Sequence, residues 1–161
     1  MNCKELDSLL QTRLNDFFIK RGFHLVKCID GKGSSMVIYR SGELYLKFII
    51  EKGMIEYKIG DRYATLDWGL EHWFSLESIN EYLNPSPLTV DYPMQKIPSI
   101  DEQVEKIRIM HDKLYERVSE FLMEDGELND RLQNYDLFSK KRIQEWLQMK
   151  YKAVKERNKT E

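Results

Sequence analysis

The chain has 161 residues, of which 42% are hydrophobic, 12% aromatic and 32% charged. This length is enough for one compact domain with its own core, and the aromatic content excludes a largely disordered protein. The 25 basic and 27 acidic residues give a formal net charge of −2, which argues against nucleic acid as a partner of the whole molecule.

The sequence predicts neither a signal peptide nor a membrane span. Its N-terminal stretch is charged throughout, and nowhere do about 18 apolar residues follow one another. The two cysteines, Cys3 and Cys28, form neither a CxxC motif nor a metal-ligand spacing. We therefore expect a cytoplasmic protein without a membrane partner, in which both thiols are free.

The N-terminal half changes its apolar period at residue 23. Apolar residues recur every three or four positions between residues 3 and 20, which predicts an amphipathic helix that Gly22 ends. From Phe23 onward the period is two. The segments FHLVKCI, SMVIYR, ELYLKFII and MIEYKIG are separated by DGKG, SG and KG turns, so they predict a four-stranded antiparallel meander.

Turn lengths decide which side chains share a face of this sheet. A two-residue turn at Lys52-Gly53 places Phe48 opposite Tyr57, whereas a three-residue loop would place it opposite Glu56. The preceding turn is predicted at Ser41-Gly42, which pairs Arg40 with Glu43, Tyr39 with Leu44 and Val37 with Leu46. One face of the sheet is then apolar: Val37, Tyr39, Leu44, Leu46, Phe48, Ile50, Ile55, Tyr57 and Ile59.

Lys47 interrupts the apolar third strand and is expected on the opposite face, across from Lys58. That second face is mixed and has two interpretations. It is either an ordinary solvated face, or a docking surface with Ile38, Tyr45 and Ile49 as apolar anchors and the lysines at its rim. If the last helix packs on this face instead, Lys47 only extends past that helix toward water.

Helices are expected to follow the sheet. Ser75 should cap a short helix through Tyr82, and prolines at 85 and 87 end it. Ser99 opens a capping box, SIDE, for a long helix that Gly126 ends. A last helix uses Leu137, Ile143, Trp146, Leu147, Tyr151 and Val154.

The predicted fold class is therefore α+β, with an N-terminal helix, a four-stranded antiparallel meander, a short helix and two longer C-terminal helices. Residues 1–161 form a single domain. Within it, residues 1–84 are helix plus sheet, 85–98 a proline-containing connector, 99–156 a helical pair and 157–161 a frayed tail.

Charge is unevenly distributed along the C-terminal half. Residues 101–130 contain ten acids and four bases, a net charge of −6, whereas residues 136–161 contain four acids and eight bases, a net charge of +4. Either the two helices pair with each other through these charges, or the acidic helix faces a basic partner.

The chain shows no recognisable catalytic motif. Its histidines lack zinc spacing, no phosphate-binding loop occurs, and EDGELND departs from a calcium loop, so neither cofactor nor metal is expected. The unusual segment is DWGLEHWF, residues 67–74. It either closes the end of the sheet or forms a binding hot spot, and an enzyme or small-ligand site there would need Asp67, Glu71 and His72 to converge.

The order of elements supports one resemblance. A GFxxV opening, the YRSGELYLKFIIEKGMIEYKIG core, the tryptophan-rich turn and the SLESINEYL helix resemble the small, single-domain bacterial immunity-type proteins encoded beside polymorphic toxins. The resemblance covers roughly residues 1 to 85. It implies a non-enzymatic protein that binds one partner protein, a toxin, and blocks it.

The candidate partner-binding residues lie on the second sheet face and at its end: Tyr45, Lys47, Ile49, Glu56, Lys58, Trp68, Glu71 and Trp73. If the target binds nucleic acid, the acidic helix could mimic phosphate through Asp101, Glu105, Asp112, Glu116 and Glu120. Two alternatives stay open. One is a small-ligand-binding domain or hydrolase-like enzyme at the tryptophan-rich turn, and the other is a homo-oligomeric scaffold; the chain could be a monomer or a homodimer.

Overall fold

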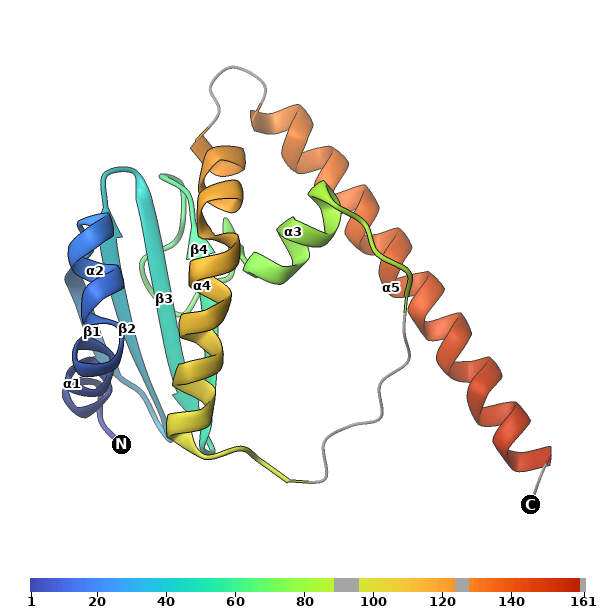
Figure 1. Ribbon diagram of the computed structural model, residues 1–161, viewed down its shortest axis with the longest axis horizontal. Coiled ribbons are helices and arrows are strands. Elements are labelled where there is room, and N and C mark those ends of the chain that lie inside the picture. Colours follow the sequence, from blue (N-terminus) through green and yellow to red (C-terminus); the bar gives the residue numbers. More distant parts are fainter. Residues whose placement is uncertain (89–95, 124–127, 160–161) are drawn as a thin grey trace.

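The computed structural model describes residues 1–88, 96–123 and 128–159, without the side chains of 128–132 (Figure 1). The elements are α1 (Cys3–Arg13), α2 (Asn15–Arg21), β1 (His24–Asp30), β2 (Ser34–Ser41), β3 (Leu44–Glu51), β4 (Met54–Gly60), β5 (Trp73–Phe74), α3 (Leu76–Leu83), α4 (Ile100–Met123) and α5 (Leu128–Lys159). The fold is α+β, as predicted. No helix within these ranges is long and apolar enough to cross a membrane.

The N-terminal helix is divided in two. The side chain of Asn2 accepts a hydrogen bond from Glu5 N, and the Glu5 carboxylate accepts one from Asn2 N, so a capping box starts α1. Leu14 leaves the helical conformation, with φ −112° and ψ 17°, and separates α1 from α2. Gly22 ends α2 in the left-handed conformation, at φ 72°. The single helix predicted over residues 3–20 is corrected accordingly.

The antiparallel meander is confirmed, and its register differs at one turn. Phe48 pairs with Tyr57 across the Lys52-Gly53 turn, as predicted. Between β2 and β3, however, Tyr39 pairs with Leu46 rather than Leu44, because Ser41 still belongs to β2 and pairs with Leu44. A shift of two residues keeps every side chain on its predicted face. The two-residue β5 extends the sheet at the end of β4 and was not predicted.

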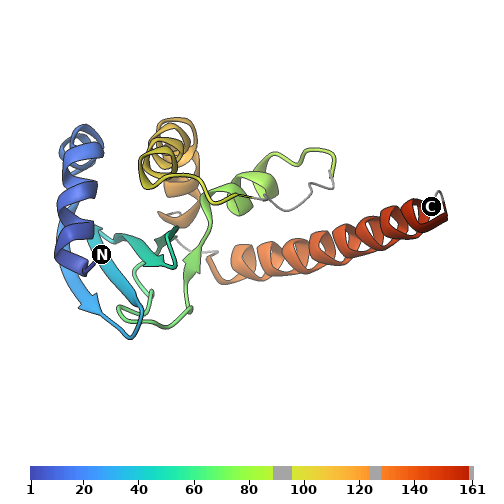
Figure 2. The same cartoon turned by 90° about the horizontal axis from the view of Figure 1, so that it is seen from below.

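The main core lies between the sheet and helices α1, α2 and α4, which cover one face (Figure 2). Leu6, Leu10 and Leu14 are fully buried in the same core as Tyr39 and Phe48. Residues of α4 also reach this core, and His111 contacts Tyr57 through a 3.1 Å hydrogen bond between Nδ1 and the hydroxyl. The apolar face predicted from turn length is therefore the core face.

The two cysteines form a disulfide bond, so the prediction of two free thiols is wrong. The first turn of α1 packs beside β1, which brings the Cα atoms of Cys3 and Cys28 to 5.4 Å, within the range that a disulfide spans. The backbone N of Cys3 also donates to Asp30 Oδ1 at 2.7 Å. Because disulfides persist mainly in oxidising compartments, this bond removes one premise of the cytoplasmic localisation, which stays a prediction.

Among the described residues, helix α5 packs on the rest of the protein through side chains of its first half. Tyr135 is buried between Phe74 and Tyr82, and Phe138 also contacts Tyr82. Arg142 pairs with Glu81 of α3. Beyond this point α5 runs away from the sheet and α4, as both ribbon views show (Figures 1 and 2). The predicted helical pair over residues 99–156 corresponds to α4 and α5, of which α5 begins at Leu128; the predicted stop at Gly126 lies outside the described residues.

Candidate functional site

Lys47 lies in the middle of β3 with only 2% of its surface exposed. Its Nζ donates hydrogen bonds to the carbonyl oxygens of Asp67, at 2.7 Å, and Gly69, at 3.0 Å, and lies 4.3 Å from the centre of the Trp73 ring. Burial lowers the pKa of Lys47 to about 8, although the nearby Asp67 and Glu56 carboxylates oppose this shift. The segment after β4, not the last helix, therefore covers the second sheet face around this lysine.

This segment, residues 61–72, makes a second small core. Ala64 and Leu66 pack with Met36, Ile38, Tyr45 and Trp73. The indole Nε1 of Trp73 donates to the carbonyl of Thr65 at 2.7 Å, which holds the first half of the segment against the strand β5 that follows it. Because the segment has almost no regular secondary structure, periodicity gave no sign that it would fold back on the sheet.

The burial corrects the list of candidate partner-binding residues. Tyr45, Lys47 and Trp73 are all buried under residues 61–72 and cannot contact a partner in this conformation. Ile49 and Lys58 are half-buried, and Glu56, Trp68 and Glu71 are exposed. Lys47 and Lys58 are cross-strand neighbours, as predicted, and Glu56 lies 3.3 Å from Lys58 Nζ. On the second sheet face and at its end, the predicted contacts that stay accessible are thus the half-buried Ile49 and Lys58 and the exposed Glu56, Trp68 and Glu71.

The three groups of the enzyme hypothesis do not share hydrogen bonds. Asp67 Oδ1 accepts from Gly69 N, and Glu71 Oε2 accepts from the Thr65 hydroxyl. Hydrogen bonds from its own backbone N–H and from Thr65 lower the pKa of Glu71. His72 instead pairs through Nδ1 with Oδ2 of Asp61, at 2.9 Å.

Asp61 was missed by the sequence reasoning. It is 2% exposed, and its other carboxylate oxygen accepts from Tyr63 N at 2.8 Å, so it closes a tight turn directly after β4. His72 adopts a positive φ of 60°, which is strained for a residue with a side chain. A partly polar cavity of about 520 Å³ lies beside His72, between Lys58, Ser75 and the start of α5.

A second hollow lies on the other side of α3. This groove of about 470 Å³ has apolar walls that include Ile55, Leu76 and Ile107. Gln103 closes the neighbouring strand edge by accepting from Ile55 N, at 2.8 Å, and donating to the Gly53 carbonyl, at 2.7 Å. Within the described part of the chain, no group of three or more His, Cys, Asp or Glu residues could hold a metal ion.

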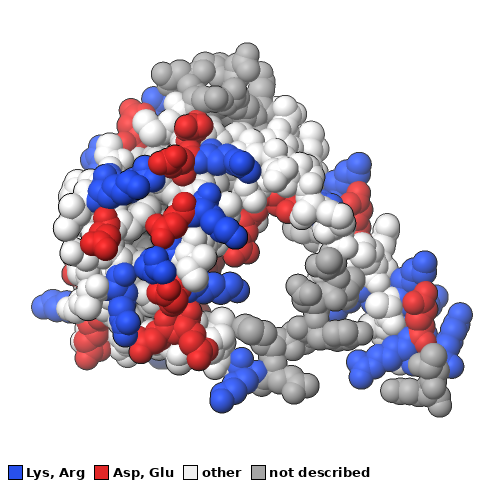
Figure 3. Space-filling model, in the orientation of Figure 1, with Lys and Arg blue, Asp and Glu red and all other residues white. Residues whose placement is uncertain are grey.

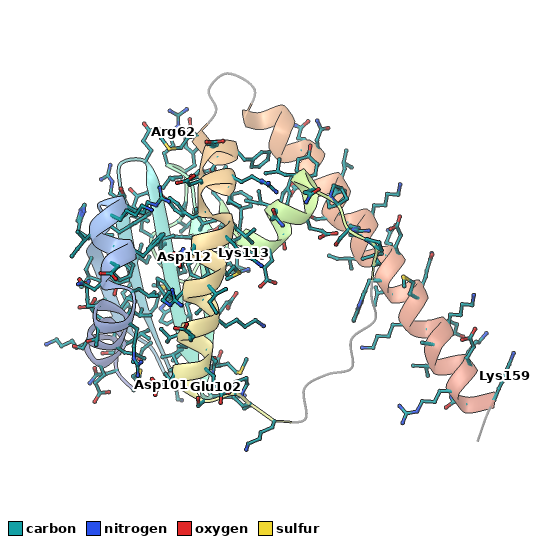
Figure 4. The ribbon with its side chains drawn as sticks, viewed as in Figure 1. Arg62, Asp101, Glu102, Asp112, Lys113 and Lys159 are labelled. Atoms are coloured by element: carbon teal, nitrogen blue, oxygen red, sulfur yellow. A yellow bond between two sulfur atoms is a disulfide. The ribbon has the colours of Figure 1, made fainter. Side chains whose placement is uncertain are left out.

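The acidic side chains of α4 are largely matched by arginines. Asp101 pairs with Arg13 of α1, and Glu116 with Arg21 of α2, both at 2.8 Å. Arg108 contacts both Glu105 and Asp112. The space-filling view shows red and blue side chains interspersed over this face, and Figure 4 labels Asp101, Asp112 and Lys113 on it. The face therefore does not present the continuous row of negative charge that phosphate mimicry needs, and these four acids pair with arginines of α1, α2 and α4 itself.

The largest set of exposed apolar side chains on one helix is found on α5. We call it the α5 stripe: Ile143, Trp146, Leu147, Tyr151 and Val154. Ile143, Leu147, Tyr151 and Val154 are 58%, 53%, 64% and 49% exposed. Trp146 is half-buried, with Lys150 Nζ 4.8 Å above its ring. The sequence predicts these residues as the apolar positions of the last helix, and their spacing alone does not say whether the helix is covered or exposed.

The α5 stripe lies in the most basic part of the protein. Residues 140–159 contain eight bases and two acids, a net charge of +6. Basic and acidic side chains surround the far end of α5 in Figure 3, and Lys159 marks this end in Figure 4. An exposed apolar stripe within a basic helix is typical of a surface that binds another molecule.

Comparisons with known proteins leave this surface unassigned. No protein-family model matches the chain, and no match was found among curated proteins or among solved structures.

Proposed function

We propose that this protein is a non-enzymatic protein-binding module and, more narrowly, an immunity-type inhibitor that binds and blocks a cognate bacterial toxin. The observation that carries the proposal is the α5 stripe, four of whose side chains are about half exposed or more. Large apolar side chains left in water on a projecting helix are stabilised when a partner covers them.

The composition of the α5 stripe supports a protein partner. Trp146 and Tyr151 belong to the residue types that contribute most to binding energy at protein interfaces. Both rings also have a lysine above them, because Lys155 Nζ lies 4.9 Å from the Tyr151 ring. Apolar anchors with a charged border are the usual arrangement at such interfaces. The inhibitor role itself rests on the resemblance of residues 1 to 85 to immunity-type proteins.

The test is a binding experiment with the tagged full-length protein and the purified product of the adjacent reading frame. We expect a stoichiometric complex that neutralises the toxicity of that product. Leu147→Asp should weaken the complex, whereas Ile19→Asp should not. Ile19 is the matched control because it is an apolar residue on α2 that is 72% exposed, far from the α5 stripe.

Three results would contradict parts of this proposal. A complex that forms without loss of toxicity removes the inhibitor role but keeps the binding module. If Leu147→Asp leaves the affinity of the complex unchanged, the contact lies outside the α5 stripe. The exposed Trp68 and Glu71 are then the next positions to substitute. The absence of any protein partner removes the proposed function altogether.

A small-ligand site is the second candidate function. Its support is the cavity of about 520 Å³ beside His72, whose Nδ1 is held by the buried Asp61. A ligand screen by NMR would show shifts at His72, Ser75 and Ser78 if the cavity is the site. Shifts confined to other positions would exclude it.

A further inference from the structure

The protein is electrically polarised along its sequence. Residues 1–139 contain 17 bases and 24 acids, a net charge of −7, whereas residues 140–161 contain eight bases and three acids, a net charge of +5. We propose that the partner receives α5 in a groove with an apolar floor and acidic walls. This inference rests on the proposed function, because it specifies the chemistry of the same partner.

The length and position of the groove follow from the spacing of the α5 stripe. Ile143, Leu147 and Val154 stand four and seven residues apart, so they lie on one face of the helix. Their 11-residue span corresponds to about 17 Å along the helix axis. A partner therefore needs an apolar floor about three helical turns long, which is the dimension of a groove that receives one amphipathic helix.

Lys150 indicates that the groove of the partner is negatively charged. It follows Leu147 by three positions and precedes Val154 by four, so it lies within the α5 stripe. A groove that covers the stripe must also cover this ammonium group, which is costly unless a carboxylate pairs with it. A partner with an acidic side chain at the floor or lip of its groove meets this requirement.

The same lysine argues against contact with the α5 of a second copy and against a lipid surface. If two copies paired through antiparallel α5 helices, the basic α5 of the second copy would face Lys150. Residues 140–159 contain only two acids, Glu145 and Glu156, to compensate the positive charge. On a lipid surface, Lys150 would have to turn away from the apolar layer that the rest of the stripe enters.

Basic residues on the other faces of α5 strengthen its attraction to an acidic partner. Lys141, Lys152 and Lys155 are exposed, and at about 100° per residue they lie toward the face opposite the α5 stripe. They therefore attract an acidic partner at long range rather than through contact with the groove. Because exposed charge pairs are screened by salt, the complex should weaken as ionic strength rises.

The inference can be tested on the full-length protein with a reference groove. Calcium-loaded calmodulin is the probe, because its Met-rich groove binds basic amphipathic helices. In isothermal titration we expect one-to-one binding at low salt that weakens by about tenfold or more at 0.3 M salt. Leu147→Asp and Lys150→Glu should each weaken it by about tenfold or more.

Two matched variants control for folding and for net charge. Ile19→Asp places the same acid on an exposed apolar position of α2, and Lys113→Glu makes the same charge reversal on an exposed position of α4 (Figure 4). Both should bind as the unmodified chain does. The same four variants are then titrated into the cognate partner once it is purified.

The outcomes separate this inference from the proposed function. A cognate partner whose binding is insensitive to salt and to Lys150→Glu overturns the acidic groove but keeps the binding module. Failure of the unmodified chain to bind calmodulin also overturns the groove. Light scattering that shows a dimer abolished by Leu147→Asp would assign the α5 stripe to a second copy. Cosedimentation with phosphatidylglycerol vesicles, abolished by the same variant, would assign it to lipid.

Discussion

Replacing Lys47 with methionine should remove a pH dependence that the buried ammonium group gives to the stability of the fold. Burial lowers the pKa of Lys47 from its ordinary value of 10.5 to about 8 in the folded protein. Between these two values the unfolded chain binds a proton that the folded chain has released. The free energy of unfolding therefore increases with pH across this window, and the penalty of the buried charge is fully present below pH 8.

The size of the effect follows from the two pKa values. Integrating the difference in bound protons from pH 7.5 to pH 9.5 gives an increase of about 2 kcal/mol for the unmodified protein. Methionine keeps the apolar stem but leaves the carbonyls of Asp67 and Gly69 without the ammonium donor. That loss costs about 1–3 kcal/mol and is the same at every pH. The two effects can thus be separated by varying the pH alone.

Urea unfolding, followed by circular dichroism at pH 7.5, 8.5 and 9.5, measures this difference. The free energy of unfolding of Lys47→Met should lack the increase of about 2 kcal/mol that the unmodified chain shows. Lys58→Met serves as the control, because Lys58 is the cross-strand neighbour but is only half-buried, and it should keep most of the increase. Parallel pH curves for Lys47→Met and the unmodified protein would refute the depressed pKa and the burial that causes it.

Three further predictions concern the rest of the fold. Replacing Cys3 and Cys28 with serine should lower the free energy of unfolding by about 3–4 kcal/mol, because the disulfide closes a loop with a sequence separation of 25; equal urea midpoints for this variant and the oxidised protein would contradict it. Burial lowers the pKa of His111 to about 3, so the folded protein should lose about 1.4 kcal/mol per pH unit as the pH falls below 6.5. His111→Leu should reduce this loss whereas His24→Leu, at an exposed position, should not, and equal acid responses of the two variants would exclude His111 as the cause. Brief trypsin digestion should cut α5 first, at Lys150 and beyond, because this half of the helix has few tertiary contacts; mass spectrometry that finds the first cuts in α4 would contradict the projection of α5.

Local pattern was sufficient to predict the four long strands of the sheet and the faces of their side chains. Alternation of apolar residues gave the four strands, and the Lys52-Gly53 turn gave the register that pairs Phe48 with Tyr57. At the other hairpin Leu44 was predicted opposite Tyr39, whereas it lies opposite Ser41. This shift of two residues leaves every side chain on the predicted face of the sheet. The four long strands and their faces depend on residues close in sequence, so they can be read without the tertiary structure, whereas the two-residue β5 depends on the chain returning to β4.

The covered and uncovered surfaces could not be predicted in the same way. Lys47 is buried because carbonyls 20 and 22 residues farther along the chain fold over it, and that segment has almost no period to read. Leu147 has the spacing of a core residue, yet nothing in the sequence says whether a partner element covers its face. The Cys3–Cys28 bond likewise depends on how α1 packs beside β1. Whether a side chain is buried depends on segments that are distant in the sequence. Periodicity shows only which side chains share a face of a helix or strand.

The packing of the sheet explains why the α5 stripe stays exposed. Helices α1, α2 and α4 occupy one face of the central strands, and residues 61–72 occupy much of the other. To bury its stripe on the second face, α5 would have to displace that segment. The displacement would break both hydrogen bonds of Lys47, at about 1.5–3 kcal/mol each, and expose Trp73, which loses a further few kcal/mol of burial. Because both faces of the sheet are already covered, α5 could bury Ile143, Leu147 and Val154 on the sheet only through this displacement, whereas another molecule could cover them without it.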